Sequence, residues 1–246
     1  MQINNVDKKR STDIIGSAIE RTGQMKIQWL GHACFKITQD SFSIVTDPYN
    51  YKYTVGYPEL KVSADMLLIS HDHYGHNCRE AVTLSGKSES ECPFDISSFE
   101  VWHDHHGGIM RGKSKVYILE AGGMKIVHMG DIGTKLTDHE QGLIFGADAM
   151  MVTAGSCTGL PSQEVWRLTE SVFPKVIIPM HYRHSTYTNR RLEHLDALLN
   201  YYESPELVHY YDTDTLELEP DTEPQIAVLK YMGGNKTKTP FPRITY

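Results

Sequence analysis

The feature of this sequence that most constrains its fold is an apolar run that ends directly in a cluster of histidines. Residues 64–70 (ADMLLIS) are almost continuously apolar, which is typical of a strand buried on both faces of a sheet. His71, His73 and His76 follow within the next six residues. A tight loop after a strand can turn three imidazoles toward one point, and imidazole is a good ligand for zinc and similar metals. The pattern therefore predicts a metal site at the end of a strand.

Three later strand ends carry further candidate ligands. The histidine-rich segment 103–106 ends one predicted strand, and we expect only one of its imidazoles to bind metal. Asp131 follows a predicted strand at 125–130, where a carboxylate can bridge two cations, although most aspartates after a glycine only make turns. His181 ends a predicted strand at 175–181, and a lone histidine there is more often packed or capping. Together the four positions indicate a metal centre far more specifically than any one of them.

The rest of the pattern is one of short strands, with several helices in the second half of the chain. Runs rich in β-branched and aromatic residues predict strands at 25–30, 33–37, 42–46, 97–103, 114–121, 125–130, 148–154, 175–181, 207–211, 215–219 and 225–231. Helices are predicted at 13–21, 77–84, 137–145, 161–172 and 189–202. Asn77 is the predicted N-cap of the second helix, and Gly122-Gly123 forms a predicted hairpin turn. This order predicts two sheets with helices outside them, not a doubly wound parallel sheet.

Length and composition limit the classes of protein to consider. The 246 residues fit one large domain, which we place at 25–246 after an N-terminal extension at 1–24. Hydrophobic residues make up 40% of the chain, enough for a sizeable core. The formal net charge of −7 argues against sequence-independent nucleic-acid binding, which depends on lysine and arginine.

The expected environment of the protein follows from what its sequence lacks. The four cysteines have no CxxC spacing, so they do not indicate a disulfide scaffold. No apolar run approaches the ~18 residues that a membrane helix needs, and the N-terminal residues lack a secretory pattern. We therefore expect a cytoplasmic protein that acts on a small-molecule substrate, without nucleic-acid or membrane partners. A homo-oligomer is compatible with this sequence.

Eight short motifs follow one another along the chain. They are Trp29-Leu30-Gly31-His32-Ala33, Thr46-Asp47-Pro48, the His71 loop, His103-Asp104, Gly107-Gly108, Arg111-Gly112, His128-Met129-Gly130-Asp131 and Pro179-Met180-His181-Tyr182. In order and approximate spacing they resemble the metallo-β-lactamase superfamily of metallohydrolases, and within it the branch similar to ascorbate-6-phosphate lactonases. The resemblance covers residues 25 to about 185. It implies an α/β fold, a four-layer αββα sandwich with the metals at one edge.

The resemblance also implies a ligand set for two metal ions. The first ion would be bound by His71, His73 and His103, and the second by His76, Asp131 and His181. Asp131 would bridge the two ions, and Asp131 and His76 would be the catalytic residues. This chain departs from the family motif HxHxDH, because Gly75 stands where the family has an aspartate that binds the second metal. Asp72, His105 or Cys157 could substitute, and the sequence does not distinguish them.

Several neighbouring residues are candidates for supporting roles. Asp104 and His128 could orient metal-binding imidazoles, because such rings usually donate their other N–H to a carboxylate or carbonyl. A structural role for His128 within its strand is the slightly favoured alternative. Arg111 and Arg183 could contact an anionic group of the substrate, although an arginine beside a glycine is more often structural. Cys157 is expected to form a pocket wall, since nothing indicates a paired base that would make it a nucleophile.

The function expected from these residues is metal-dependent hydrolysis. A metal-activated water would attack an ester-like bond of a small substrate, such as a lactone that can carry a phosphate. The cofactor would be Zn²⁺, as one or two ions, with Mn²⁺ or Fe²⁺ as alternatives. One alternative function is a phosphodiesterase acting on nucleotide or phospholipid substrates. Another is a non-catalytic metal-binding protein whose second site decayed at Gly75.

Overall fold

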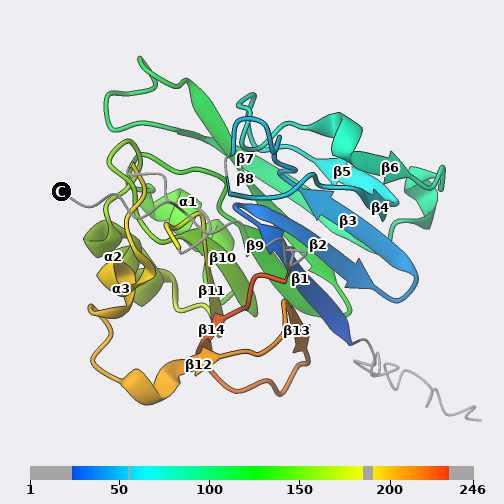
Figure 1. Cartoon of the computed structure of the whole chain (residues 1–246). Coiled ribbons are helices and arrows are strands. Elements are labelled where there is room, and N and C mark those ends of the chain that lie inside the picture. The colour runs from blue at the N-terminus through cyan, green and yellow to red at the C-terminus, as the bar shows by residue number, and fades with distance from the viewer. Residues whose placement is uncertain (1–23, 55, 185–190, 233–246) are drawn as a thin grey trace, which may run out of the picture.

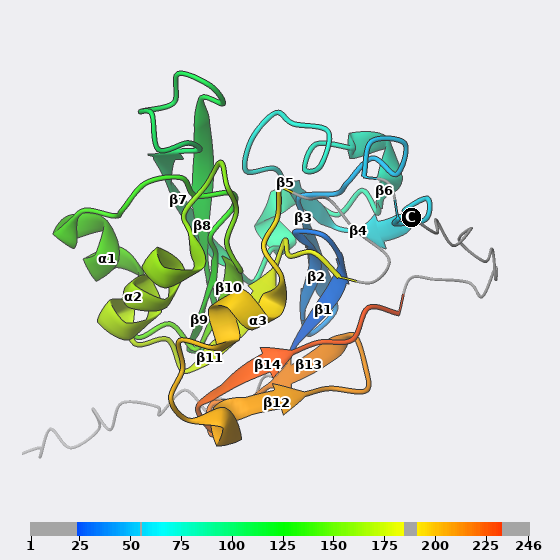
Figure 2. The same ribbon diagram turned by 60° about the vertical axis from the view of Figure 1, so that its left-hand side comes forward.

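Two β-sheets packed face to face form the frame of the molecule in the computed structural model, which describes residues 24–54, 56–184 and 191–232 (Figures 1 and 2). The smaller sheet contains, in spatial order, β13 (Thr215–Leu218), β1 (Met25–Gly31), β2 (Cys34–Gln39), β3 (Phe42–Thr46) and β5 (Met66–Leu68). The larger sheet contains β12 (Val208–Tyr210), β14 (Gln225–Val228), β11 (Val176–Met180), β10 (Ala149–Thr153), β9 (Met124–His128), β8 (Lys113–Ala121) and β7 (Asp95–Trp102). The predicted α/β class with two sheets is confirmed.

The helices cover the outer face of the larger sheet. In both views α1 (Asp138–Ile144), α2 (Ser162–Val172) and α3 (Leu195–Leu199) lie on the side of this sheet that faces away from the smaller sheet (Figures 1 and 2). Strands β10, β11 and β14 are buried at every position, because helices cover one face and the smaller sheet covers the other. This two-sided burial is the reason that 148–154 and 175–181 are nearly continuous apolar runs.

The outer face of the smaller sheet has a different cover. A short two-stranded sheet of β4 (Val62–Ala64) and β6 (Val82–Leu84) lies near it, and Tyr49 and Tyr57 pack there with Cys34. Three short 3-10 helices complete the described secondary structure, at Arg79–Ala81, Glu89–Glu91 and Pro205–Leu207. No helix in the described ranges is long and apolar enough to span a membrane.

The main core lies between the two sheets. Ile27, Phe35 and Ile37 of the smaller sheet belong to the same buried cluster as Leu119 and Ile126 of the larger one. Parallel pairing of β9, β10 and β11 brings the carboxyl ends of these strands to one edge of the larger sheet. This arrangement is what allows strand-end residues far apart in the sequence to meet.

Most predicted elements are confirmed to within a few residues. The helices predicted at 137–145 and 161–172 correspond to α1 and α2. Gly122 and Gly123 form the predicted two-residue turn between β8 and β9, with φ values of 58° and 74° that favour glycine. The predicted extension at 1–24, including its helix at 13–21, lies outside the described residues except for Gln24.

Three local predictions are wrong. The run 64–70 is not one strand buried on both faces, because Asp65 separates β4 from β5 and β5 is a half-buried edge strand. The helix predicted at 77–84 is a 3-10 turn followed by β6, which pairs in parallel with β4, and Asn77 caps nothing there. Of the helix predicted at 189–202, only Leu195–Leu199 is helical, and residues 189–190 lie outside the described chain.

Asp65 stabilises the fold at the point where it interrupts the strand. Its carboxylate accepts hydrogen bonds from the Ser43 backbone N–H at 2.7 Å and from the Ser85 hydroxyl at 2.5 Å, and Lys87 Nζ lies 3.3 Å away. The Ser85 hydrogen bond in particular outweighs desolvation and lowers the pKa of Asp65 to about 2.

We expect Asp65→Asn to lower the free energy of unfolding at pH 7 by about 1–3 kcal/mol, because hydrogen bonds to a charged acceptor are lost. Because folding lowers the pKa of Asp65, the ionised side chain stabilises the folded state fully above ~3.9, the pKa of aspartate in the unfolded chain. This contribution to stability is lost as the pH falls through about 2, the pKa in the folded chain. The difference between the two proteins should therefore shrink below pH 4 in urea unfolding. Asp95→Asn, at an exposed position of β7, is the matched control. A difference that does not change with pH would contradict this prediction.

Candidate metal centre

Six strand ends from both sheets meet at one edge of the molecule. The residues that follow them are His32 after β1, Asp47 after β3, the loop His71–His76 after β5, His103 after β7, Asp131 after β9 and His181 after β11. Loops at strand ends are where a rigid scaffold commonly carries functional side chains. The edge therefore gathers almost every ligand candidate that the sequence indicated.

The histidines and Asp131 form three overlapping groups that could each hold a metal ion. Within each group, one ligand atom per residue lies within 4.8 Å of the others. The groups are His71, His73 and His76; then His71, His103 and Asp131; then His32, His76 and His181. The structure thus brings together all six residues predicted as ligands and adds His32.

Asp131 lies between the two ends of this cluster. Its Oδ2 atom is 3.3 Å from His103 Nε2, 3.9 Å from His76 Nε2 and 3.8 Å from His181 Nε2. The carboxylate is nearly buried, so these imidazoles are its main polar neighbours. A carboxylate in this central place can contact cations on both of its sides.

Asp47 orients the histidine loop through hydrogen bonds to Ser70 and His76. Its carboxylate accepts hydrogen bonds from the Ser70 backbone N–H at 2.7 Å, from the Ser70 hydroxyl at 2.5 Å and from His76 Nδ1 at 2.8 Å. The His76 interactions outweigh desolvation and lower the pKa of Asp47 to about 2, so the carboxylate is ionised and His76 Nδ1 is the donor. The Ser70 hydroxyl, which donates to Asp47, accepts from His71 Nδ1 at 2.9 Å. In both imidazoles Nδ1 is thereby fixed as the hydrogen-bond donor, and Nε2 keeps a free lone pair.

The electrostatics of the cluster fit a cation. Desolvation lowers the pKa of His71 to about 2 and that of His181 to about 4, so both rings are neutral at pH 7. Desolvation acts to raise the pKa of Asp131, but its interactions with His181 and His103 outweigh this effect and hold it below the ordinary value. The ionised Asp131 carboxylate is buried beside the neutral rings of His71 and His181, and a buried charge is stabilised by a bound cation.

Unpaired nitrogen atoms give an independent test of whether the residues fit a metal. His71 Nε2, His76 Nε2 and His103 Nε2 are buried and have no hydrogen-bond partner among the described residues. Buried polar atoms are normally paired, and neutral imidazole nitrogen is the form that binds zinc or iron. The donor set of imidazoles and one carboxylate therefore fits a divalent metal ion.

Three residues of this edge adopt a backbone conformation that is rare for residues other than glycine. His32, Asp47 and His181 have φ values of 54°, 44° and 56°, and each directly follows a strand. Such conformations cost about 1–3 kcal/mol each and cluster at functional sites. This backbone conformation turns each side chain out of the direction of its strand and toward the shared edge.

Two residues predicted to support the ligands instead organise the surrounding backbone. The Asp104 carboxylate accepts hydrogen bonds from four backbone N–H groups, those of His106, Gly108, Met110 and Arg111. Desolvation acts to raise the pKa of Asp104, and these N–H groups more than offset it. His128 bonds the Ala33 carbonyl at 2.9 Å and accepts from the Gly130 N–H, which agrees with a structural role between the sheets.

The three residues considered as substitutes for the missing carboxylate lie away from the ligand groups. Asp72 is exposed and accepts a hydrogen bond from Asn77. His105 and Cys157 are exposed and line an adjacent cavity of about 530 Å³. Arg183 follows His181 by two residues, and its backbone N–H donates to the Glu193 carbonyl.

A cavity of about 290 Å³ opens onto the ligand cluster. Its lining includes His73, Asp131, His181 and two arginines, Arg111 and Arg191. Arg111, which the sequence singled out as a candidate contact for an anionic substrate group, is thus a lining residue of this cavity.

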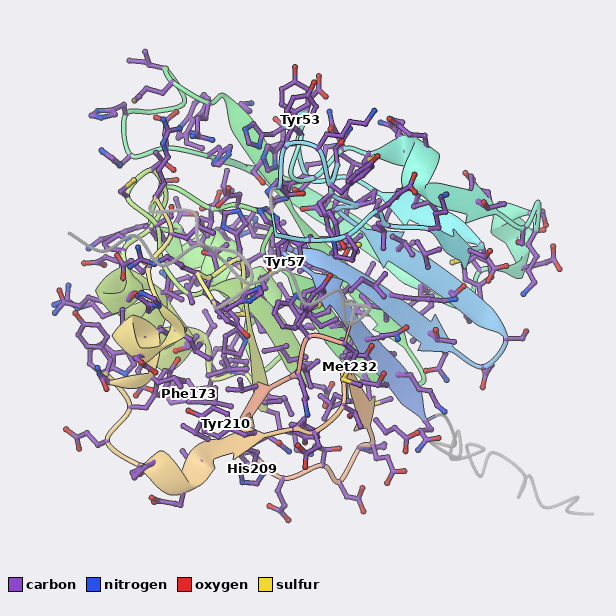
Figure 3. All side chains as sticks on the ribbon, viewed as in Figure 1. Tyr53, Tyr57, Phe173, His209, Tyr210 and Met232 are labelled. Carbon is purple, nitrogen blue, oxygen red and sulfur yellow. The ribbon has the colours of Figure 1, made fainter. Side chains whose placement is uncertain are left out.

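Two tyrosines stand at the rim of this cavity. Tyr53 and Tyr74 both line it, and their rings stack with centroids 4.2 Å apart. Figure 3 shows Tyr53 projecting from the upper end of the molecule, far from Tyr210 and Phe173 at the opposite end. The rim therefore exposes an aromatic surface next to the candidate ligands.

His32 and Asp47 are the functional residues that the sequence reasoning did not assign. Both stood in motifs that carried the family resemblance, but neither received a role. Their position at or within two residues of the end of a predicted strand was the available signal, the same one that singled out Asp131 and His181. Their contacts join segments that are far apart in the sequence, and the local spacing of residues does not reveal such contacts.

Comparison with known proteins relates this site to one family. Residues 26–181 match a family model described as the β-lactamase superfamily domain. A relative from Methanopyrus kandleri, described as a UPF0173 metal-dependent hydrolase, is 25% identical over 196 residues, which cover 64% of this chain and 84% of the relative. A relative of the same description from Archaeoglobus fulgidus is 26% identical over 198 residues, covering 64% and 83%.

Solved structures agree with this relationship. A crystal structure from Thermotoga maritima, described as a candidate Zn-dependent hydrolase of the metallo-β-lactamase superfamily, is 28% identical with a TM-score of 0.63. The match covers 83% of this chain and 98% of that chain. A structure from Parabacteroides distasonis has a TM-score of 0.57 at 15% identity, covering 85% and 94%, which is a likeness of fold alone.

We expect Asp47→Asn to weaken zinc binding by about 10–100-fold, because the amide no longer fixes the donor nitrogens of His71 and His76. Chelator competition followed by elemental mass spectrometry measures this effect. Asp72→Asn, an exposed substitution in the same loop, should leave the affinity unchanged. Equal affinities for Asp47→Asn and the unmodified protein would show that Asp47 does not position the ligands.

Proposed function

This chain belongs to the metallo-β-lactamase superfamily, and from that premise we propose that it is a metal-dependent hydrolase of a small anionic ester, with lactones, including phosphorylated ones, as the first candidates. The observation that carries the proposal is the buried Asp131 carboxylate among imidazoles with unpaired nitrogens, facing a cavity of about 290 Å³. The description of its relatives as metal-dependent hydrolases supports the same reaction class.

The residues divide into two candidate sets of ligands. The family resemblance implies His71, His73 and His103 for one ion and His76, Asp131 and His181 for a second. In the structure each of these six residues belongs to at least one of the three close groups, although the groups overlap. When bound, a divalent ion supplies Lewis acidity and lowers the pKa of water toward neutrality. Zinc is the first candidate, in one or two copies, because imidazole dominates the donor set, with Fe²⁺ or Mn²⁺ as alternatives.

The protein's own groups supply position and charge for the reaction. Asp131 lines the cavity and is ionised, so it is the group placed to accept a proton from the attacking water. His71 and His76, fixed through Ser70 and Asp47, keep their donor nitrogens in place without reorganisation during the reaction. The neutral state of the His71 imidazole at pH 7 keeps it available as a ligand.

The cavity favours a small substrate that carries negative charge. Arg111 and Arg191 both line it, and guanidinium groups bind carboxylate or phosphate in a two-pronged manner. Arg111 is close enough to the cluster that its charge, after burial and the charge of His76, contributes to lowering the pKa of His73. The volume is near the lower limit of ligand pockets, which fits a compact molecule.

A phosphodiesterase acting on a nucleotide is the second candidate. The stacked Tyr53 and Tyr74 at the rim favour it, because exposed aromatic rings can bind a base by stacking. A lactone needs no such platform. A panel that contains both lactones and model phosphodiesters separates the two functions.

The first test compares hydrolysis of phosphorylated lactones, neutral lactones, simple esters and a bis-aryl phosphodiester by zinc-loaded protein. Asp131→Asn should reduce kcat on the best substrate by at least about 100-fold, because a proton acceptor is lost. The exposed variant His105→Asn should retain full activity. A protein that binds metal yet hydrolyses nothing in the panel would instead support a non-catalytic metal-binding role.

Arg111→Gln should raise KM for a phosphorylated substrate about tenfold, which corresponds to the loss of ~1.4 kcal/mol, and leave KM for the uncharged analogue unchanged. Steady-state kinetics with the two substrates measures this selective effect. Lys113→Gln is the matched control, since Lys113 is a nearby exposed cation paired with Glu100. Equal changes in KM for both substrates would contradict a role in anion binding.

A further inference from the structure

The space above Gly75 is filled by the imidazole of His32. A Cβ atom at position 75 would lie 2.8 Å from His32 Cε1 and 3.3 Å from His32 Nε2. Gly75 does not have the left-handed φ that would itself require glycine. A larger residue at position 75 and His32 in its present place therefore exclude each other. The glycine is needed here for the space that the imidazole occupies.

His32 lies where it can act together with two candidate ligands. One nitrogen of each of His32, His76 and His181 falls within 4.8 Å of the others. The His32 ring meets the His181 ring edge-on at a centroid distance of 4.2 Å, and the His76 ring at 5.0 Å. His32 is only 3% exposed, so its imidazole is buried, and it also lines the cavity of about 290 Å³.

The backbone of His32 is held firmly in an unfavourable conformation. Its carbonyl accepts hydrogen bonds from the Trp29 indole N–H at 3.0 Å and from the His181 backbone N–H at 3.1 Å. The next carbonyl, of Ala33, accepts from His128 Nε2 at 2.9 Å. These bonds join the end of β1 to β9 and β11, and they offset the cost of a φ of 54° at His32.

We infer that His32 takes the ligand position that Gly75 leaves open, so that the second metal site is built from His32, His76, His181 and Asp131. This inference deepens the proposed function and rests on it for the existence of a second metal ion. Replacing a carboxylate by an imidazole removes one negative charge from the site. The site should consequently prefer zinc or iron over manganese, because carboxylates favour manganese and imidazoles favour the other two.

The test is metal stoichiometry of the full chain after equilibrium dialysis against zinc, measured by elemental mass spectrometry. The unmodified protein should bind two tight equivalents, and His32→Ala should retain one. The double variant His32→Ala/Gly75→Asp should regain the second equivalent, because a carboxylate can then enter the space that the imidazole left. His105→Ala, at an exposed histidine, is the matched control and should keep two.

Cobalt substitution gives a second readout that does not depend on activity. The visible absorption of the Co²⁺ protein should change when His32 is replaced, and change again in the double variant, since the donor set passes from imidazole to carboxylate. Thermal unfolding monitors folding, and His32→Gln replaces His32→Ala if the smaller side chain destabilises the protein.

The outcomes separate this inference from the proposed function. Two tight equivalents in His32→Ala with an unchanged Co²⁺ spectrum would overturn the inference, and so would an unmodified protein that never binds more than one. A double variant that still binds only one equivalent of zinc would show that an aspartate at position 75 cannot replace the His32 imidazole as a ligand. That result would overturn the inference that the two side chains occupy the same ligand position. Hydrolysis is measured on the same samples, and two-metal binding without hydrolysis would overturn the proposed function alone.

Discussion

The buried carboxylate of Asp47 is the constraint on which the site depends. It accepts three hydrogen bonds, two from Ser70 and one from His76, and through Ser70 it also fixes His71. Desolvating a carboxylate is costly, and the φ of 44° adds strain. Both costs are offset because the ionised group binds only donors. The result is a histidine loop whose free nitrogens are oriented before any metal arrives.

The two sheets contribute different halves of the candidate metal centre. The smaller sheet supplies His32 and the loop that begins at His71, and the larger sheet supplies His103, Asp131 and His181. The backbone hydrogen bond from His181 to His32 joins the halves directly. Because the halves meet only when the sheets pack, the shape of the cluster is set by the hydrophobic core between them.

Gly75 and His32 are coupled by space at the candidate site. Only a side chain at position 75 and an imidazole at position 32 compete for the same space. Fold alone therefore does not decide metal or substrate, and the individual side chains around the shared edge do.

Apolar runs and the polar residue after each run are local features, so the amino-acid pattern alone was enough to predict most strand ends and the candidate ligands that follow them. His71, His73 and His76 could be read this way, as could Asp131 and His181. The contacts of His32 and Asp47, and the position of Asp72, His105 and Cys157 outside the ligand groups, are visible only in the folded chain. The direction of a side chain after a strand depends on φ and on the packing of two sheets, and hydrophobic periodicity carries neither. For the same reason Asp65 could not be foreseen as the break in an apolar run, since its partners Ser43 and Ser85 come from other segments.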